Sequence, residues 1–406
     1  MRNVVFVAPF LMRATLQFVA GAAGLKGARL YLISQDREEK IPRELREQIA
    51  GYWHLENALD EDAISEAVAE MSRRVGPISR LIGTLEQLQI PLARVRQKLS
   101  IDGLGVEASI NFREKSVMKN VLRQHKVPCA RHCLADSQEP AIEFCRQVGF
   151  PVVVKPPAGA GSRDTFQVDD FGGLATAFQK LRLSAQAPLL LEEFIMGNEH
   201  TFESAFVNGE MVWHSITRYF PTPLQVLENP WIQWCILLPR EIDHPHFDDI
   251  RATARQSVRA LGMQTGFTHL EWFRRMDGSI AVSEVAARPP GGQLTSMHGF
   301  AHDFDIHAAW AELMIFDRFQ PPERHFATGA VFLRGQGQGR VKAIHGLDRI
   351  QKELGPMIVE SKLPRLQQPA SSTYEGEGYV IIKHPQTSVV EKALGRMLTT
   401  IRVELG

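Results

Sequence analysis

The chain has 406 residues, enough for about two to four domains with a substantial core. Its 46 lysines and arginines balance 46 aspartates and glutamates, which argues against a nucleic-acid-binding protein, since such proteins usually carry a basic excess. Apolar residues make up 44% of the chain, yet no apolar run is long enough for a membrane-spanning helix. The 4 cysteines are few for this length and favour reduced thiols, which predicts a cytoplasmic protein.

The first third of the sequence alternates strand-like and helix-like stretches. Two apolar runs flank a helical stretch that ends in glycine, which is the pattern of a βαβ unit in a parallel sheet and predicts an α/β fold. The apolar N-terminus is interpreted as the start of this unit rather than as a secretion signal, because Arg13 and Gln17 interrupt it. The expected strands cover residues 3–10, 28–36 and 78–84, and the expected helices cover residues 13–27 and 63–76.

The rest of the chain mixes helices with strands that are joined by glycine turns. The pair Asn208-Gly209 predicts a hairpin turn, and the glycine-rich stretches near the C-terminus predict antiparallel strands. Expected helices cover residues 111–132 (closed by Pro128), 140–149, 245–262 and 388–405, and expected strands cover residues 150–156, 328–346 and 375–385. From these changes in character we place domain boundaries near residues 112 and 322.

Several familiar motifs are absent from the sequence. No GxGxxG follows the first strand, so the dinucleotide fingerprint is missing, and no GxxxxGK[ST] occurs, which excludes a P-loop protein. The hydrolase motif GxSxG and the zinc-protease motif HExxH are absent too.

The stretch THLEWFRRMDGSIAVSEVAAR carries two glutamates on one predicted hairpin. Asp277-Gly278 is a strong signal for a two-residue turn. With that pair as the loop, the register brings three pairs face to face: Met276 with Ser279, Phe273 with Val282, and Glu271 with Glu284. The turn alone therefore predicts that two carboxylates lie directly opposite each other on one face of a sheet.

Such a pair needs a physical reason. Like charges in direct cross-strand pairing are destabilising, whereas a cation between Glu271 and Glu284 reverses the sign of the interaction. Carboxylates with room for water and phosphate oxygens suit Mg²⁺. The alternative is a solvated sheet face, on which the repulsion is small. Phe273 and Val282 are expected on the same face, which argues that this face is covered.

Lys155 ends a β-branched strand and is followed by a loop of small residues. Gly159, Gly161 and Ser162 would let backbone N–H groups approach an anion closely, and the lysine would neutralise phosphate charge. The alternative is a strand-end lysine that reaches solvent before an ordinary turn.

Acidic residues end the next predicted strand. Glu192 and Glu193 close it, and Glu199 follows shortly after. A carboxylate at a strand end can accept hydrogen bonds from a ribose hydroxyl or an adenine amino group. Taken alone, these residues are equally consistent with surface charge.

Two further stretches contain metal-binding residue types. Cys129 and Cys133 flank His132, but a Cys-x-x-Cys pair is absent. In HGFAHDFDIH, two histidines four positions apart would share a helix face, and the group comprises His298, His302, Asp303 and His307. Polar residues near a substrate pocket or on a surface helix are the favoured explanation of this second stretch, so zinc is held only as an alternative.

Taken in order, these elements resemble the ATP-grasp superfamily over about residues 113–315. The helix EKSVMKNVLRQHKVPC, the strand and loop FPVVVKPPAGAGS, the stretch EEFIMGNE and the two-glutamate hairpin carry the resemblance. It implies a parallel-sheet pre-ATP-grasp domain at residues 1–112, a two-lobed ATP-grasp domain at 113–321 with its lid at about 125–195, and a small C-terminal antiparallel β-rich domain at 322–406.

The resemblance also implies roles for individual residues. ATP would be held by Lys115, Lys155, Gly159, Gly161, Ser162, Glu192, Glu193, Ile195, Glu199 and Phe273. Mg²⁺, or Mn²⁺ in its place, would be held by Glu271 and Glu284. The catalytic set would be Arg288, Lys155, Gly291 and Gly292. The sequence departs from the family pattern at Ala286, where many members carry a metal-binding asparagine, and this departure puts the second metal ion in doubt.

The activity that the resemblance implies is ATP-dependent ligation. A substrate carboxylate would become an acyl phosphate and then react with an amine, and EVAARPPGGQL is similar to L-amino-acid ligases of the dipeptide-forming type. The partners would be a small carboxylate and a small amine, with no nucleic acid and no membrane, and related enzymes often form homodimers. A formate- or bicarbonate-using enzyme of purine or biotin-carboxylase type is one alternative, and a non-catalytic nucleotide sensor is another. The sensor would predict loss of the two glutamates or of Arg288, and all are present.

Overall fold

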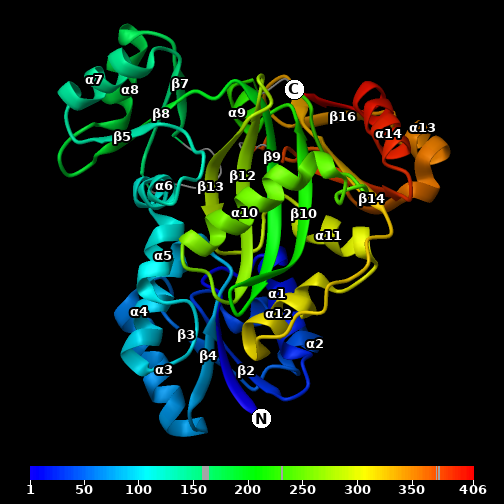
Figure 1. Cartoon of the computed structure of the whole chain (residues 1–406). Helices are drawn as coiled ribbons and strands as arrows, with labels where there is room; N and C mark the ends of the chain where they lie inside the picture. Colours follow the sequence, from blue (N-terminus) through cyan, green and yellow to red (C-terminus); the bar gives the residue numbers. More distant parts are fainter. Residues whose placement is uncertain (158–163, 230–231, 372, 374) are drawn as a thin grey trace.

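Four sheets and their covering helices make up the computed structural model, which describes residues 1–157, 164–229, 232–371, 373 and 375–406 (Figure 1). Glycines 159 and 161 and Ser162 therefore lie outside the described residues. The sequence-based assignment to the α/β class is confirmed by a parallel N-terminal sheet that is followed by two larger mixed lobes. No helix in the described ranges is long and apolar enough to cross a membrane.

The N-terminal sheet is parallel, as the βαβ pattern predicts, and its strand order is β3-β2-β1-β4. Its two central strands each bury a run of four apolar residues, 4–7 in β1 and 30–33 in β2, because helices cover both faces of the sheet. The strands are β1 (Arg2–Val7), β2 (Ala28–Ser34), β3 (Gly51–His54) and β4 (Ile78–Ile82). The helices are α1 (Arg13–Ala23), α2 (Arg43–Arg46), α3 (Glu61–Val75) and α4 (Gln89–Leu99), with short 3₁₀ turns at Glu38–Lys40 and Glu86–Leu88.

The helix expected over residues 111–132 is two helices in the structure. Helix α5 covers Val106–Arg113 and α6 covers Lys115–Gln124. Glu114 separates them because its backbone is extended, with φ of −92° and ψ of 104°. The break gives α6 a new direction and places Lys115 at its first position.

A second lobe, the lid, is a four-stranded sheet in the order β5-β8-β6-β7, covered by α7 and α8 (Figure 1). Its apolar core is separate from those of the other sheets. The strands are β5 (His132–Ala135), β6 (Val152–Lys155), β7 (Phe166–Val168) and β8 (Leu189–Glu193). The helices are α7 (Gln138–Val148) and α8 (Phe171–Leu181).

The largest element is an eight-stranded sheet in the order β13-β12-β9-β10-β11-β14-β18-β17. Helices α10 and α14 cover one face, and α11 packs on the other face. Its strands are β9 (Gly197–Val207), β10 (Glu210–Phe220), β11 (Trp234–Leu238), β12 (Gly266–Arg275), β13 (Ile280–Ala286), β14 (Ala327–Leu333), β17 (Ile358–Lys362) and β18 (Gly378–His384). The accompanying helices are α9 (Pro223–Glu228), α10 (Asp248–Ala260), α11 (Leu294–His302), α12 (Ile306–Phe316), α13 (Leu347–Leu354) and α14 (Thr387–Thr400), with 3₁₀ turns at Pro245–Phe247 and Gly355–Met357.

Two features of the C-terminal part differ from the sequence analysis. The last expected helix ends at Thr400, and the chain continues as β19 (Arg402–Leu405), which joins β15 (Gly335–Gln336) and β16 (Val341–His345) in a small sheet. Strands β14 and β18 pair antiparallel as expected, but they extend the eight-stranded sheet. A division of the chain at residue 322 stays a prediction, and it would cut one continuous sheet.

Candidate functional site

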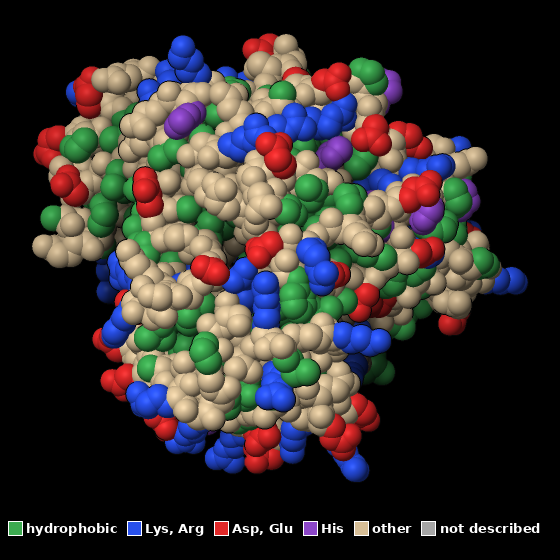
Figure 2. Space-filling model, turned by 60° about the horizontal axis from the view of Figure 1, so that its bottom comes forward, with side chains coloured by type: hydrophobic (Ala, Val, Ile, Leu, Met, Phe, Trp, Pro, Cys, Tyr) green, Lys and Arg blue, Asp and Glu red, His purple; other side chains and the backbone are tan. Residues whose placement is uncertain are grey.

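A cavity of about 430 Å³ lies between the lid and the eight-stranded sheet. Figure 2 shows a hollow in the middle of one face, with acidic and basic side chains close together around it. All of the predicted site residues that the structure describes line this cavity: Lys115, Lys155, Glu192, Glu193, Ile195, Glu199, Glu271, Phe273, Glu284, Arg288, Gly291 and Gly292. They come from α6, from lid strands β6 and β8, from β9 and the connection that precedes it, and from the β12–β13 hairpin with the loop that follows it. The fold thus brings together residues that are far apart in the sequence.

Glu271 and Glu284 lie directly opposite each other across β12 and β13, as the sequence predicts. The loop length and the register that produce this pairing differ from those predicted. Arg275 N donates to Ser279 O at 2.8 Å, so the loop is the three-residue segment 276–278 rather than a two-residue turn. A bulge between Glu271 and Trp272 then shifts the register by one residue and restores the glutamate pair.

The altered register corrects two of the expected pairs. Phe273 faces Ala281 rather than Val282, and Ser279 lies opposite Arg275 rather than Met276. Val282 faces Trp272 and is fully buried with it in the core beneath α10, on the opposite face from the glutamates. The inference that Phe273 and Val282 together cover the glutamate face was therefore wrong, although Phe273 does line the cavity.

Cations compensate the carboxylates of the cavity. Lys115 Nζ lies 2.5 Å from Glu284 Oε1, and Lys155 Nζ lies 2.9 Å from Glu192 Oε2. Burial alone would raise the pKa of Glu284, but Lys115, Lys155 and other nearby cations outweigh it and lower the pKa. Burial also opposes ionisation of Lys155, yet the surrounding carboxylates raise its pKa. Lys155 is thus held charged.

Glu192 has a second cation partner that the sequence analysis missed. Lys119 Nζ lies 3.3 Å from Glu192 Oε1 and donates to Ser283 O at 2.8 Å. Burial would raise the pKa of Glu192, but Lys119 and Lys155 lower it to about 2. Lys119 is four positions after Lys115, so both lie on one face of α6, and this spacing could have indicated it.

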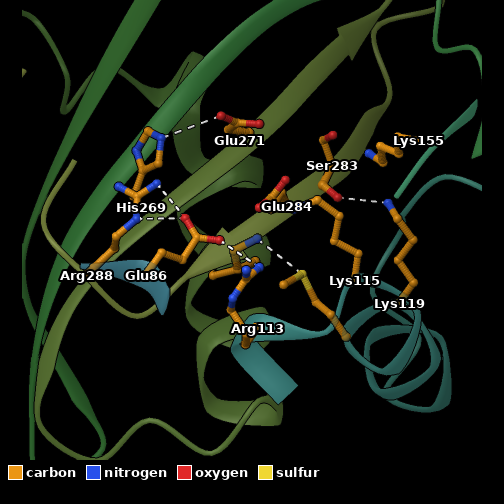
Figure 3. A network of polar contacts seen from close by, with 12 residues as sticks. Glu86, Arg113, Lys115, Lys119, Lys155, His269, Glu271, Ser283, Glu284 and Arg288 are labelled. Atoms are coloured by element: carbon orange, nitrogen blue, oxygen red, sulfur yellow. Dashed lines mark hydrogen bonds and ion pairs between the residues drawn. The ribbon is translucent and has the colours of Figure 1, made fainter. Parts of the chain in front are cut away.

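Arg288 is anchored by a buried carboxylate, Glu86, which the sequence analysis also missed. Arg288 Nε donates to Glu86 Oε2 at 3.0 Å, and Arg113 Nη1 lies 3.2 Å from Glu86 Oε1 (Figure 3). Glu86 comes from a 3₁₀ turn in the N-terminal lobe, so only the tertiary fold brings it to the site. No local signal in the sequence points to it.

A buried histidine connects Glu271 to the interior of the eight-stranded sheet. His269 Nδ1 lies 2.8 Å from Glu203 Oε1. Its Nε2 lies 3.6 Å from Glu271 Oε1 (Figure 3). Burial would lower the pKa of His269, but the carboxylates of Glu203 and Glu271 outweigh it and raise the pKa to about 9. The imidazole is therefore charged at neutral pH and holds Glu271 in place.

Glu193 and Glu199, both expected to contact the nucleoside, have different neighbours: Glu193 is paired with arginines, whereas Glu199 lies near another carboxylate. Glu193 Oε1 accepts from Arg275 Nη2 at 3.0 Å, and its other oxygen lies 2.5 Å from Arg131 Nε. Glu199 lies opposite Phe273 in the sheet, and burial with the nearby Glu271 raises its pKa well above the usual value. A carboxyl with a raised pKa beside the cavity is suited to accept a cation or to donate a hydrogen bond.

The donor set suits a hard divalent cation. Glu271 and Glu284 present carboxylate oxygens to one cavity, and oxygen ligands are those that Mg²⁺ prefers. Ala286 lies opposite His269 and offers no ligand atom. Two carboxylates leave several positions for water and phosphate oxygens, which is the usual arrangement for Mg²⁺.

The zinc alternatives gain no support. In the described part of the chain, no group of three or more His, Cys, Asp or Glu residues is placed to hold a metal. His298 Nε2 lies 3.5 Å from Glu203, His302 Nδ1 lies 3.0 Å from Glu323 O, and His307 packs against Phe18. These histidines serve separate contacts.

The fold and the cavity define a two-lobed α/β protein whose interlobe site is built from lysines and paired carboxylates. The ATP-grasp domain family matches residues 120–299, so the chain carries an ATP-grasp domain and the resemblance read from the sequence is confirmed. An L-arginine-specific L-amino acid ligase of Bacillus subtilis is 24% identical over 230 residues, which cover 55% of this chain and 54% of the ligase. The chain thus spans about half the length of this relative.

Solved structures share the fold over the whole chain. The L-amino acid ligase of Bacillus licheniformis matches with a TM-score of 0.77 at 18% identity, covering 100% of this chain and 99% of the ligase. The biotin carboxylase domain of Hydrogenobacter thermophilus 2-oxoglutarate carboxylase, solved with MgADP, ADP and bicarbonate, matches with a TM-score of 0.69 at 15% identity, covering 99% and 90%. At these identities the likeness concerns the fold.

The raised pKa of His269 predicts a pH-dependent contribution to stability. The folded pKa of about 9 exceeds the usual histidine value of 6.5. The stabilisation from the charged imidazole is therefore complete below pH 6.5 and is lost as the pH rises through 9. The stability difference between the wild type and His269→Gln should therefore shrink by about 3 kcal/mol over this window. Urea unfolding at several pH values measures it, and a difference that is constant with pH would contradict the assignment.

Proposed function

We propose that the protein is an ATP- and Mg²⁺-dependent ligase that joins a small carboxylate to an amine. In this reaction a carboxylate oxygen attacks the γ-phosphorus of ATP, which gives an acyl phosphate and ADP. The amine then attacks the acyl carbon, and phosphate leaves. The observation that carries the proposal is the convergence of Glu271, Glu284, Lys115, Lys155 and Arg288 on one cavity. This set supplies what phosphoryl transfer requires, namely charge compensation and positioning.

The lysines would bind the phosphates of ATP. In the structure each is paired with a cavity carboxylate, Lys115 with Glu284 and Lys155 with Glu192. Lys155 ends a lid strand, whereas Lys115 starts α6 beside the central sheet. Bound phosphate would thus be contacted from both lobes. Glu193, Ile195, Glu199 and Phe273 line the same cavity and would contact the nucleoside.

Arg288 would hold the transferred phosphoryl group and the acyl phosphate. Its contact with Glu86 fixes the direction of the guanidinium while leaving part of the group beside the cavity. Gly291 and Gly292 follow it in the cavity wall, and their backbone N–H groups would approach the acyl oxygen. A Cβ on Gly291 would meet no atom within 4 Å, so this wall leaves open space for a substrate.

Glu271 and Glu284 would hold Mg²⁺. The ion would supply charge neutralisation at the phosphates when bound. Lys115 lies against Glu284 and His269 lies against Glu271, so each carboxylate has a cationic neighbour in the absence of the ion.

Amino acids are the favoured substrate class, because the relative from Bacillus subtilis is an amino acid ligase. The second candidate is a bicarbonate- or formate-using enzyme, which the whole-chain likeness to a bicarbonate-bound biotin carboxylase domain favours. Both candidate enzymes would activate their acid in the same cavity, so they are distinguished by which acid supports ADP release.

The proposal is tested by an ADP-release screen. Amino acids and small carboxylic acids, singly and in pairs, are incubated with ATP and Mg²⁺, with bicarbonate and formate as separate arms. We expect ADP release that needs two amino acids, or one acid and one amine. Release with bicarbonate or formate alone would favour the second candidate, and no release with any acid would contradict ligase activity.

The metal assignment predicts the effect of Glu284→Gln. This change keeps the shape of the side chain but removes its charge, so ADP release should fall about 100-fold or more. The matched control is Glu107→Gln, a change of an exposed glutamate on α5, which should keep full activity. Circular dichroism should show that both variants stay folded. Full activity of the Glu284 variant would refute the metal role.

A further inference from the structure

Lys119 is a fully buried lysine that does not line the cavity, whereas Lys115 and Lys155 do. A buried ammonium is costly unless it is paired and hydrogen-bonded. Lys119 meets both conditions, with Glu192 on one side and the carbonyl of Ser283 on the other. These two contacts join strand β8 of the lid to strand β13 of the central sheet. Figure 3 shows the contact between Lys119 and Ser283.

Ser283 is the residue on which the carboxylate pair depends. Next to the loop, the register pairs Phe273 with Ala281 and Trp272 with Val282. If it continued unchanged, Glu271 would face Ser283, and Glu284 would face Leu270 on the core side of the sheet. Because a one-residue shift turns every side chain to the other face, the bulge at Ser283 alone puts Glu284 into the cavity.

Helix α6 contacts the bulge from both sides. Lys119 Nζ donates to Ser283 O at 2.8 Å, and the Val285 N–H donates to Met118 Sδ at 3.2 Å. On the near side of the bulge, Val282 N donates to Pro128 O at 2.8 Å, just beyond the end of the same helix. An extra residue in a bulge is left out of the ladder, so these external contacts supply hydrogen bonds that the neighbouring strand does not.

We propose that Lys119 is a positioning residue for the metal site. It fixes the Ser283 bulge and thereby the placement of Glu284 opposite Glu271, and it does so from outside the cavity wall. Its second contact, with Glu192, ties this bulge to strand β8 of the lid, and Glu192 is also paired with Lys155. The inference rests on the proposed function insofar as Glu271 and Glu284 bind a divalent cation.

The test measures Mn²⁺ binding rather than turnover. Mn²⁺ is titrated into the protein with ADP present, and bound Mn²⁺ is read by electron paramagnetic resonance. Lys119→Met should weaken Mn²⁺ binding at least about tenfold, as losses of supporting contacts around metal ligands usually do. Binding of ADP without metal, measured by calorimetry, should stay within about twofold, because Lys119 does not line the cavity.

A matched control separates positioning from general loss of a buried cation. Arg96 is also buried and also donates to backbone carbonyls, those of Leu81 and Leu104, but in the N-terminal lobe. Arg96→Met should leave Mn²⁺ binding unchanged. Lys119→Gln, whose donor is one atom nearer to the backbone, replaces Lys119→Met if that variant does not fold, and the same loss is expected.

The outcomes are distinguishable. Unchanged Mn²⁺ binding in the folded Lys119 variant, or an equal loss in Arg96→Met, would overturn the positioning role. Glu284→Gln serves as the reference for the metal site itself. If the wild type and Glu284→Gln bind Mn²⁺ equally, the metal pair of the proposed function fails and the inference falls with it.

Discussion

Two carboxylates that face each other across a β-hairpin repel, and this repulsion governs how the cavity is built. Glu271 and Glu284 are held in that position by the strands, so neither can move away without breaking the sheet. A cationic side chain lies against each of the two carboxylates. Lys115 lies against Glu284, and the charged His269 lies against Glu271. Each carboxylate of the pair thus has a cationic neighbour within the protein.

The same compensation extends across the cavity. Lys155 and Lys119 share Glu192, and Arg288 and Arg113 share Glu86. Each group that would bind a phosphate therefore already has a carboxylate partner in the protein. Such a site needs little rearrangement of charge when an anion enters, because lysine and arginine exchange one anionic partner for another. The neutral net charge of the chain fits this local balance.

Much of this arrangement was predictable from the sequence because it depends on local patterns. The βαβ unit, the lysine at the end of a β-branched strand and the two-glutamate hairpin each have a short-range signature, and the ATP-grasp domain followed from their order. The Glu271–Glu284 pair was predicted correctly from a register that was partly wrong. A three-residue loop shifts the pairing one way, and the bulge at Ser283 shifts it back.

The parts that the sequence did not predict depend on contacts between distant segments. Glu86 reaches Arg288 from the N-terminal lobe, 202 positions away, and nothing near it in sequence indicates a site. The break at Glu114 and the strand at residues 402–405 depend on tertiary packing, which local sequence propensity does not predict. Lys119 differs, since its spacing from Lys115 places it on the same helix face, but its burial could be known only from the fold.

The central claim is that a substrate carboxylate is activated by phosphoryl transfer in this cavity. Oxygen labelling tests it most directly. An acid labelled with ¹⁸O in its carboxylate is turned over with ATP and an amine, and the released phosphate is examined by ³¹P nuclear magnetic resonance. The acyl phosphate route predicts that one labelled carboxylate oxygen appears in each phosphate, because the bond that breaks is the one between that oxygen and the acyl carbon. Phosphate that carries no label would contradict the account.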